Sequence, residues 1–415
     1  MIHWLLNYLH RNTDLPGMRI GEYLSFRSAA AIIISLLIVI FMGKRIIRYL
    51  RRKQIGEDIR DLGLDGQLQK KGTPTMGGII IILAVLIPTL LFGDLTNIYI
   101  QLMLISTIWL GFIGGLDDYI KVFRHNKEGL KGRFKIVGQV GLGIIVGTTM
   151  WQSQDIIIHE KSFDSTEYNI VNVETGEVID HHTVKYVSHT TPDKSAKTSI
   201  PFLKDTVLNY NIFTAGNDTA AWLIYILVAI FVITAVSNGA NLTDGIDGLL
   251  TSVSVPIVLV LGVLAYLSGH LIYSDYLNIM YLPDSGELVV FAAAFAGALV
   301  GFLWYNSFPA QIFMGDTGSL TIGGLIAVFA LCIRKELLLP LLCGIFLVEA
   351  LSVIIQTGYF KYTKRKYGEG RRVFLMAPIH HHYQKKGLFE TKIMMRFFII
   401  SLLLSALTVV TLKIQ

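Results

Sequence analysis

Two adjacent carboxylates, Asp117 and Asp118, stand at the end of an apolar run long enough to cross a bilayer. A charged side chain at the mouth of a membrane span is costly unless it has a partner or a task, which favours a functional site at the membrane surface. Neighbouring carboxylates repel each other, and a divalent cation relieves that repulsion. The alternative is an acidic helix end that faces water. Gly114 and Gly115 favour the first interpretation, because glycine lets another backbone or a ligand approach closely.

Two further segments carry aspartates without any lysine or arginine. In residues 237–248, a helix would place Asn241, Asp244 and Asp247 along one stripe. Residues 304–319 combine aromatic side chains that could stack on a base with a glycine-flanked Asp316. Such loops supply metal ligands and open N–H groups, so both are predicted to bind a cation or a ligand. For residues 237–248 the alternative is a capped helix start.

Basic residues are concentrated beside the acidic pair and before the second apolar run. Lys121 and Lys135 follow the two aspartates, and cation and anion sites side by side are what a metal-bound diphosphate requires. Residues 70–78, Lys-Lys-Gly-Thr-Pro-Thr-Met-Gly-Gly, combine charge, hydroxyl groups and an irregular turn that suits a phosphate or a nucleotide. A helix-capping loop would use many of the same residues, so this second signal is weak on its own.

The composition excludes a soluble globule of this size. Of the 415 residues, 53% are hydrophobic and 16% are charged, and the mean hydropathy is +0.55. Apolar runs of about 17 residues or more predict an all-α polytopic membrane protein with about ten transmembrane helices. The predicted spans are residues 23–42, 77–93, 98–116, 136–151, 222–236, 249–267, 288–304, 320–333, 337–359 and 397–412.

The distribution of basic residues predicts the orientation. Alternate connections between the spans hold 25 of the 36 lysines and arginines, so they are predicted to be cytoplasmic and both termini external. These connections are residues 43–76, 117–135, 237–248, 305–319 and 360–396. The formal charge of +6 is mainly this topology signal, with an added attraction for anionic membrane lipid, and nothing favours nucleic acid as a partner. Cys332 and Cys343 lie in or beside spans, so disulfides are expected to play no part.

Residues 1–415 are predicted to form one membrane domain with a single long polar insertion, residues 152–218. Alternating apolar and polar residues on both sides of a Glu-Thr-Gly-Glu sequence predict one or two β-hairpins on the external side. The histidines of the insertion, including His181, His182 and His189, lack metal-ligand spacing. A structural or accessory role is therefore favoured over a metal site.

The ninth span and the loop after it carry further polar groups. Glu349 and Gln356 share one helical face, which is predicted to point inward because a glutamate facing lipid would be costly. The loop 360–396 contains three consecutive histidines, residues 380–382. Adjacent histidines cannot all reach one metal from a regular backbone, so hydrogen bonding to phosphate or sugar is favoured over zinc ligation.

Five cytoplasmic segments carry a family resemblance that extends over nearly the whole chain. They are residues 71–78, 116–121, 241–248, 306–319 and 377–382. Together they closely resemble the phospho-N-acetylmuramoyl-pentapeptide-transferase family of the polyprenyl-phosphate N-acetylhexosamine-1-phosphate transferase superfamily. The triple histidine and the Gly-Thr-Pro-Thr-Met-Gly-Gly stretch point to this branch. Residues 152–218 depart from the pattern, because a shorter hairpin is expected there.

The resemblance implies a reaction and its setting. Phospho-N-acetylmuramoyl-pentapeptide would pass from UDP-N-acetylmuramoyl-pentapeptide to undecaprenyl phosphate, releasing UMP and forming lipid I, the first lipid-linked peptidoglycan precursor. The site would lie on the cytoplasmic face of the bacterial inner membrane, with Mg²⁺ as cofactor, and the family is expected to be a homodimer. Since a phosphate attacks a diphosphate and both are negative, Mg²⁺ and lysines must neutralise the approach.

The resemblance also implies roles for single residues. Asp316 would ligate Mg²⁺ with support from Asp118, while Asp117 would orient or deprotonate the lipid phosphate. Phe313 would stack on the uracil, and His381 would join the catalytic group. The remaining implied substrate-binding residues are Lys71, Thr75, Lys121, Lys135, Asn241, Asp244, Gly245, Asp247, Asn306, Gln356, His380 and His382.

Alternatives stay open at this point. A sister enzyme of the superfamily would use UDP-N-acetylglucosamine, against which the histidine segment argues. A transporter would also place carboxylates in the membrane, but the chain has no inverted repeat of motifs and its polar residues cluster in loops. Within the transferase interpretation, direct transfer and covalent two-step transfer through an aspartate are both open.

Overall fold

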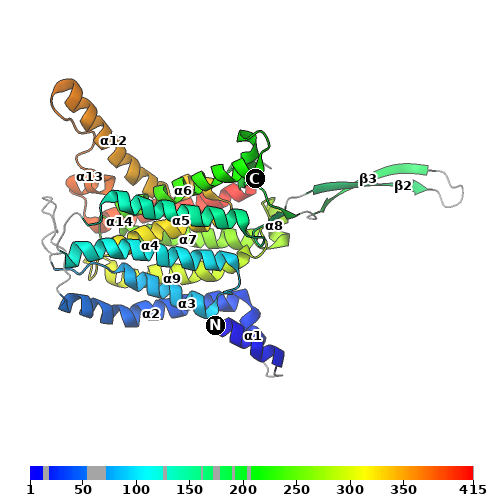
Figure 1. Ribbon diagram of the computed structural model, residues 1–415, viewed down its shortest axis with the longest axis horizontal. Helices are drawn as coiled ribbons and strands as arrows, with labels where there is room; N and C mark the ends of the chain where they lie inside the picture. The colour runs from blue at the N-terminus through cyan, green and yellow to red at the C-terminus, as the bar shows by residue number, and fades with distance from the viewer. Residues whose placement is uncertain are drawn as a thin grey trace.

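A bundle of long helices, lying side by side along one direction, forms the body of the molecule (Figure 1). The structure is a computed structural model that describes residues 1–12, 18–53, 72–124, 129–159, 162–171, 178–188, 192–202 and 207–414. In Figure 1 a β-ribbon projects from one end of the bundle, whereas α12 and α13 lie at the other.

Nine helices of the described ranges are long and apolar enough to cross a membrane. They are α2 (Leu24–Arg52), α4 (Ile98–Phe123), α5 (Gly132–Gln152), α6 (Asp218–Thr243), α7 (Leu249–Ser268), α9 (Leu288–Asn306), α10 (Gly315–Cys332), α12 (Gly344–Tyr367) and α14 (Glu390–Ile414). A tenth apolar helix, α3 (Gly78–Phe92), has 15 residues. At about 1.5 Å per residue it is shorter than a hydrocarbon core of roughly 30 Å. The predicted helical membrane class is confirmed, and each predicted span corresponds to one of these ten helices.

Short elements complete the described chain. The short helices are α1 (Ile2–Asn12), η1 (Met18–Glu22), η3 (Tyr210–Phe213), α8 (Leu271–Leu277), η4 (Ser285–Glu287), η5 (Glu336–Leu338), α11 (Leu339–Leu342) and α13 (Ile379–Lys385). The strands form three antiparallel pairs: β1 (Ile158–His159) with β4 (Pro192–Asp193), β2 (Ser162–Val171) with β3 (Val178–Ser188), and β5 (Lys197–Ser199) with β6 (Val207–Asn209). The predicted hairpin is confirmed as β2 and β3, while its connection, residues 172–177, and His189 lie outside the described residues.

Helix α10 is the central element of the bundle. It packs against α3, α4 and α6, and nearly all of its residues are buried. Its first turn meets the loop before α3: the Phe313 nitrogen donates to the Pro74 carbonyl at 2.8 Å, and the Gly78 nitrogen donates to the Met314 carbonyl at 2.8 Å. A Cβ atom at position 78 would lie 2.1 Å from the Gly318 nitrogen, so only glycine permits this approach.

A buried charged group follows the other end of α10. Lys335 donates to the Ser199 hydroxyl at 2.9 Å, and Glu336 accepts from Thr198. The Arg334 guanidinium lies over the Trp222 ring, 5.2 Å from its centroid. These contacts attach strand β5 to the bundle and give each buried charged side chain a polar or aromatic neighbour.

Arg27, the charged residue inside the first span, is also paired. Its guanidinium donates two hydrogen bonds to the Glu287 carboxylate, at 2.7 and 2.6 Å, in the forked geometry that suits arginine. The pair joins α2 to η4 and explains how α2 holds a buried cation.

We expect Gly78→Ala to destabilise the protein, because the added Cβ must displace the backbone of α10. Overpacking of this kind costs about 1–3 kcal/mol. The matched control is Gly358→Ala in α12, where nothing lies within 4 Å of the added Cβ. Thermal unfolding in detergent should show a lower midpoint for Gly78→Ala and no loss for Gly358→Ala. Equal midpoints for the two variants would contradict the close packing of α3 on α10.

Candidate active site

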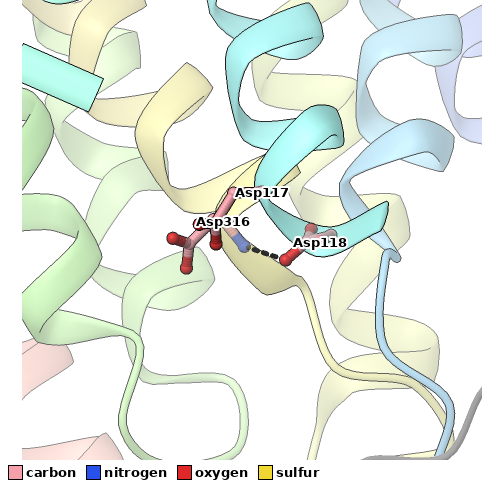
Figure 2. A group of neighbouring side chains, drawn as sticks. All are labelled: Asp117, Asp118 and Asp316. Atoms are coloured by element: carbon pink, nitrogen blue, oxygen red, sulfur yellow. Dashed lines mark hydrogen bonds between the residues drawn. The ribbon is translucent and has the colours of Figure 1, made fainter. Parts of the chain in front are cut away.

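Asp117, Asp118 and Asp316 meet where the end of α4 reaches the first turn of α10 (Figure 2). One oxygen from each carboxylate lies within 4.8 Å of the other two. The acidic pair and the third acidic loop, about 200 residues apart in sequence, therefore form one cluster. This juxtaposition agrees with the predicted placement of both loops on the same side.

Asp118 caps the start of α10. Its Oδ1 accepts a hydrogen bond from the Asp316 nitrogen at 3.0 Å, which Figure 2 marks, and its Oδ2 accepts from the Thr317 nitrogen at 2.9 Å and hydroxyl at 2.5 Å. A negative charge at a helix N-terminus also interacts favourably with the helix dipole. A Cβ at Gly114 would lie 2.3 Å from the Asp316 carbonyl oxygen, so the close approach predicted at this glycine is confirmed.

Asp117 and Asp316 share two lysines. Lys121 Nζ lies 2.6 Å from Asp117 Oδ2 and 3.3 Å from Asp316 Oδ1. Lys135 Nζ lies 3.0 Å from Asp117 Oδ1 and also contacts Asp316 Oδ2. The Leu130 nitrogen donates to Asp117 Oδ1 at 2.7 Å. The basic residues predicted to lie near the aspartates are in direct contact with them. This pairing offsets the free-energy cost of removing the carboxylates from water.

The donor set of this cluster fits a hard divalent cation. Carboxylate oxygens are the ligands that Mg²⁺ prefers, and three carboxylates converge here. The oxygens of Asp118 already accept three hydrogen bonds from α10. Asp316, the predicted ligand, and Asp118, its predicted support, both belong to this cluster, and Asp118 also fixes the first turn of α10.

The end of α6 extends the site. Asn241 donates from Nδ2 to Asp316 Oδ1 at 3.0 Å and to the Ser319 hydroxyl at 2.8 Å. One turn later, Asp244 terminates the helix and Gly245 meets His380. A Cβ at position 245 would lie 2.1 Å from His380 Nε2. Because α6 ends at Thr243, Asp244 and Asp247 do not continue the helical stripe that was predicted from Asn241. The end of α6 and the turn after it connect the aspartate cluster to the histidine segment.

Asp247 and Asn306 are buried and hold the loop that precedes α10. Asp247 Oδ2 accepts from the Ala310 nitrogen at 2.9 Å. Asn306 Oδ1 accepts from the Gly248 nitrogen at 3.2 Å, and its Nδ2 donates to the Ile312 carbonyl at 3.0 Å. In the structure these predicted binding residues shape the loop that presents Phe313.

Phe313 and Thr75 belong to the two loops that meet beside the aspartate cluster. Phe313 is half-buried, and its backbone pairs with residues 74–77. Thr75 is buried against Gly315, where a Cβ would lie 3.0 Å from the threonine hydroxyl. Lys71 lies outside the described residues.

The three histidines occupy α13 and face different partners. His381 Nδ1 lies 2.6 Å from Gln384 Oε1. His382 Nδ1 accepts from the Leu375 nitrogen at 3.1 Å. Partial burial, and then the charge of Lys386, lowers the pKa of His382, which keeps this nitrogen free to accept. Each of the three histidines thus contacts a different neighbour: Glu349, Gln384 and the Leu375 nitrogen.

Gln356 and Glu349 support α13 from α12. Gln356 Oε1 accepts from the Val373 and Phe374 nitrogens, both at 3.0 Å, and its Nε2 donates to the Phe374 carbonyl at 3.1 Å. Glu349 is fully buried, which confirms that this face of the helix points inward. The amide of Gln356, predicted to bind substrate, is engaged with the loop before the histidines.

Comparison with known proteins finds relatives that match the chain from end to end. Residues 193–334 match the model of Glycosyl transferase family 4, and residues 70–82 match Phospho-N-acetylmuramoyl-pentapeptide-transferase signature 1. A protein from Flavobacterium psychrophilum named phospho-N-acetylmuramoyl-pentapeptide-transferase is 55% identical over 420 positions, covering 100% of both chains. The chain belongs to the phospho-N-acetylmuramoyl-pentapeptide-transferase family.

Other members of the family agree. Proteins of the same name from Parabacteroides distasonis and Porphyromonas gingivalis are 55% and 50% identical, over 433 and 434 positions, again across 100% of each chain. The resemblance inferred from the motifs is confirmed.

Several residues at the site escaped the sequence analysis. Thr317 donates to Asp118, and Ser319 accepts from Asn241. Both directly follow Asp316 in a Thr-Gly-Ser sequence, and hydroxyl residues at a helix start are a capping signal that could have identified them. Nothing in the sequence indicates that the capping carboxylate comes from another helix.

We expect Thr317→Val to weaken the junction of α4 and α10, because it removes a hydroxyl donor to the buried carboxylate of Asp118. A hydrogen bond to a charged group contributes about 1.5–3 kcal/mol. The matched control is Thr321→Val, whose hydroxyl donates to the Thr317 carbonyl of its own helix at 2.7 Å. Thermal unfolding should separate the two variants, and equal stability would show that the hydroxyl does not hold Asp118.

Proposed function

We propose that this chain transfers phospho-N-acetylmuramoyl-pentapeptide from UDP-N-acetylmuramoyl-pentapeptide to undecaprenyl phosphate, releasing UMP and forming lipid I. The observation that carries the proposal is the cluster of Asp117 and Asp316 with Lys121 and Lys135 at one end of a membrane bundle. The names of relatives at 50–55% identity over the whole chain support the same reaction.

The chemistry joins two anions, and the site matches that demand. An oxygen of undecaprenyl phosphate would attack the sugar-bearing phosphorus of the UDP substrate, a new P–O bond would form, and the bond to the UMP oxygen would break. Asp117, at the end of α4, is proposed to orient the lipid phosphate or take its proton. Lys121 and Lys135 would stabilise the charge that develops on the phosphate oxygens.

Asp316 is proposed to ligate Mg²⁺ with support from Asp118, which also fixes the first turn of α10. Bound there, Mg²⁺ would neutralise the diphosphate and the departing UMP oxygen. Asn241 donates to Asp316 and so fixes its orientation. In this assignment Asp118 acts chiefly on the position of Asp316, since its own oxygens are engaged by α10.

The remaining residues are proposed to form the pocket for the soluble substrate. The half-buried Phe313 would stack on uracil, with Lys71, Gly245 and Asp247 around it. Asp244, Asn306, Gln356 and the histidines of α13 would line the sugar and diphosphate, and Thr75 would lie at the entrance from the α3 loop. Support for this grouping comes from the contacts that join α6, α13 and the loop before α10.

We place the site on the cytoplasmic face of the bacterial inner membrane, where the soluble UDP substrate and the lipid carrier can meet. The basic connections and the gathering of the motif loops at one bundle end support this orientation. The termini would then be external. A homodimer is also proposed, from family resemblance, and light scattering of the purified protein would measure it.

The deciding experiment is release of UMP by the purified protein in detergent. We expect release only when UDP-N-acetylmuramoyl-pentapeptide, undecaprenyl phosphate and Mg²⁺ are all present, and EDTA should abolish it. Release only when UDP-N-acetylglucosamine replaces the muramoyl substrate would support the same reaction type but identify the protein as a sister enzyme with a different sugar substrate. No release from folded protein with either nucleotide sugar would overturn the proposed function.

We expect Asp117→Asn to lower turnover at least about a hundredfold while the UDP substrate still binds, because a positioned base contributes 10²–10⁴-fold. UMP release measures turnover, and calorimetric titration measures binding. Asp155→Asn, an exposed aspartate after α5, is the matched control and should leave both unchanged. Wild-type turnover in Asp117→Asn would remove Asp117 from the role of base.

A further inference from the structure

Glu349 is a charged residue within a membrane span that the reaction scheme above leaves without a task. It lies in the second turn of α12, and its exposed fraction is 0%. An ionisable side chain inside a span is costly and is retained where it has a specific partner. The partners of Glu349 therefore indicate what it does.

Both partners of Glu349 belong to the start of α13. Its Oε2 accepts a hydrogen bond from the Ile379 nitrogen at 2.9 Å and lies 3.1 Å from His380 Nδ1. The Ile379 nitrogen is one of the first-turn donors that a helix leaves without an internal partner. One carboxylate thus satisfies the helix terminus and faces the imidazole.

The His380 ring is confined on its other side by α6. It is 0% exposed, and a Cβ at Gly245 would lie 2.1 Å from its Nε2. The ring therefore fits between the carboxylate of α12 and the bare backbone that follows α6.

His380 connects this contact to the residues assigned to the reaction. Its ring centroid is 4.1 Å from that of His381. Gly245 follows Asn241 by one helical turn, and Asn241 donates to Asp316. A displacement of His380 would therefore shift His381 directly, and it would disturb the aspartate cluster through the end of α6.

We propose that Glu349 is a positioning residue for the transfer reaction, which holds His380 and the start of α13 against the Asp244–Gly245 turn. The proposal rests on the proposed function, since it concerns the same site. Glu349 touches no substrate in this scheme, and its effect passes through His380. A misplaced catalytic group lowers kcat. Loss of a contact that binds the substrate and the transition state equally raises KM instead.

The test is steady-state UMP release by the full-length protein with UDP-N-acetylmuramoyl-pentapeptide, undecaprenyl phosphate and Mg²⁺. Glu349→Gln keeps an oxygen that can accept from the Ile379 nitrogen but removes the charge beside His380. We expect kcat to fall about tenfold or more with little change in KM for the UDP substrate. The matched carboxylate control, Glu369→Gln, is exposed in the loop after α12 and should behave as wild type.

A second variant acts on the same ring from the other side. Gly245→Ala pushes on His380 Nε2, so it should also lower kcat, and the double variant should lose little more than the worse single variant. Losses that multiply would mean that the two residues act independently and would overturn the proposal. Wild-type kcat in Glu349→Gln would overturn it as well.

A readout without turnover separates this proposal from the proposed function. Hydrogen exchange at residues 379–383 should be faster in Glu349→Ala than in wild type and unchanged in Glu369→Gln. If the wild type releases no UMP, the proposed function fails, and this exchange result still supports or refutes the contact. Unchanged exchange in Glu349→Ala would refute it.

Discussion

The site depends on a carboxylate of one span that caps the first turn of another. Asp118 accepts three hydrogen bonds from the start of α10, and this contact fixes where Asp316 lies relative to Asp117. The cap requires the helices to approach closely, which Gly114 and the Gly78–Gly318 contact permit. Without this cap, nothing would fix the position of Asp316 of α10 relative to Asp117 of α4 and to the two lysines between them.

The sequence predicts the membrane class, the spans and the gathering of the motif loops, since these depend on hydropathy and on the placement of basic residues. It also identifies the aspartates and the inward face of α12, because charge near a span has few uses. It does not reveal which aspartate caps α10. Adjacent helical residues point about 100° apart, so one of them must face away from the lysines, and the rotation of α4 is set by packing.

The sequence also does not separate residues that bind substrate from residues that hold a loop, because tertiary packing decides between these roles. Asn306 and Gln356 were predicted to bind substrate from family resemblance, and both make several hydrogen bonds to loop backbone. Polar side chains near a ligand site can either touch the ligand or hold the loop that does, and residue type is the same in both cases. The pairing of residues 74–78 with the loop before α10 is likewise a tertiary contact that residue types do not predict.

Helix α10 is anchored at both of its ends. Negative carboxylates lie at its first turn, and the chain beyond its last turn carries the buried Arg334 and Lys335, so both ends match the helix dipole in sign. A helix held this way cannot slide along its axis without separating buried charges from their partners at one end. Asp316 therefore keeps a constant position along the axis of the bundle. An enzyme that joins a soluble molecule to a lipid phosphate needs such a fixed level, since the headgroup of its lipid partner is confined to one plane.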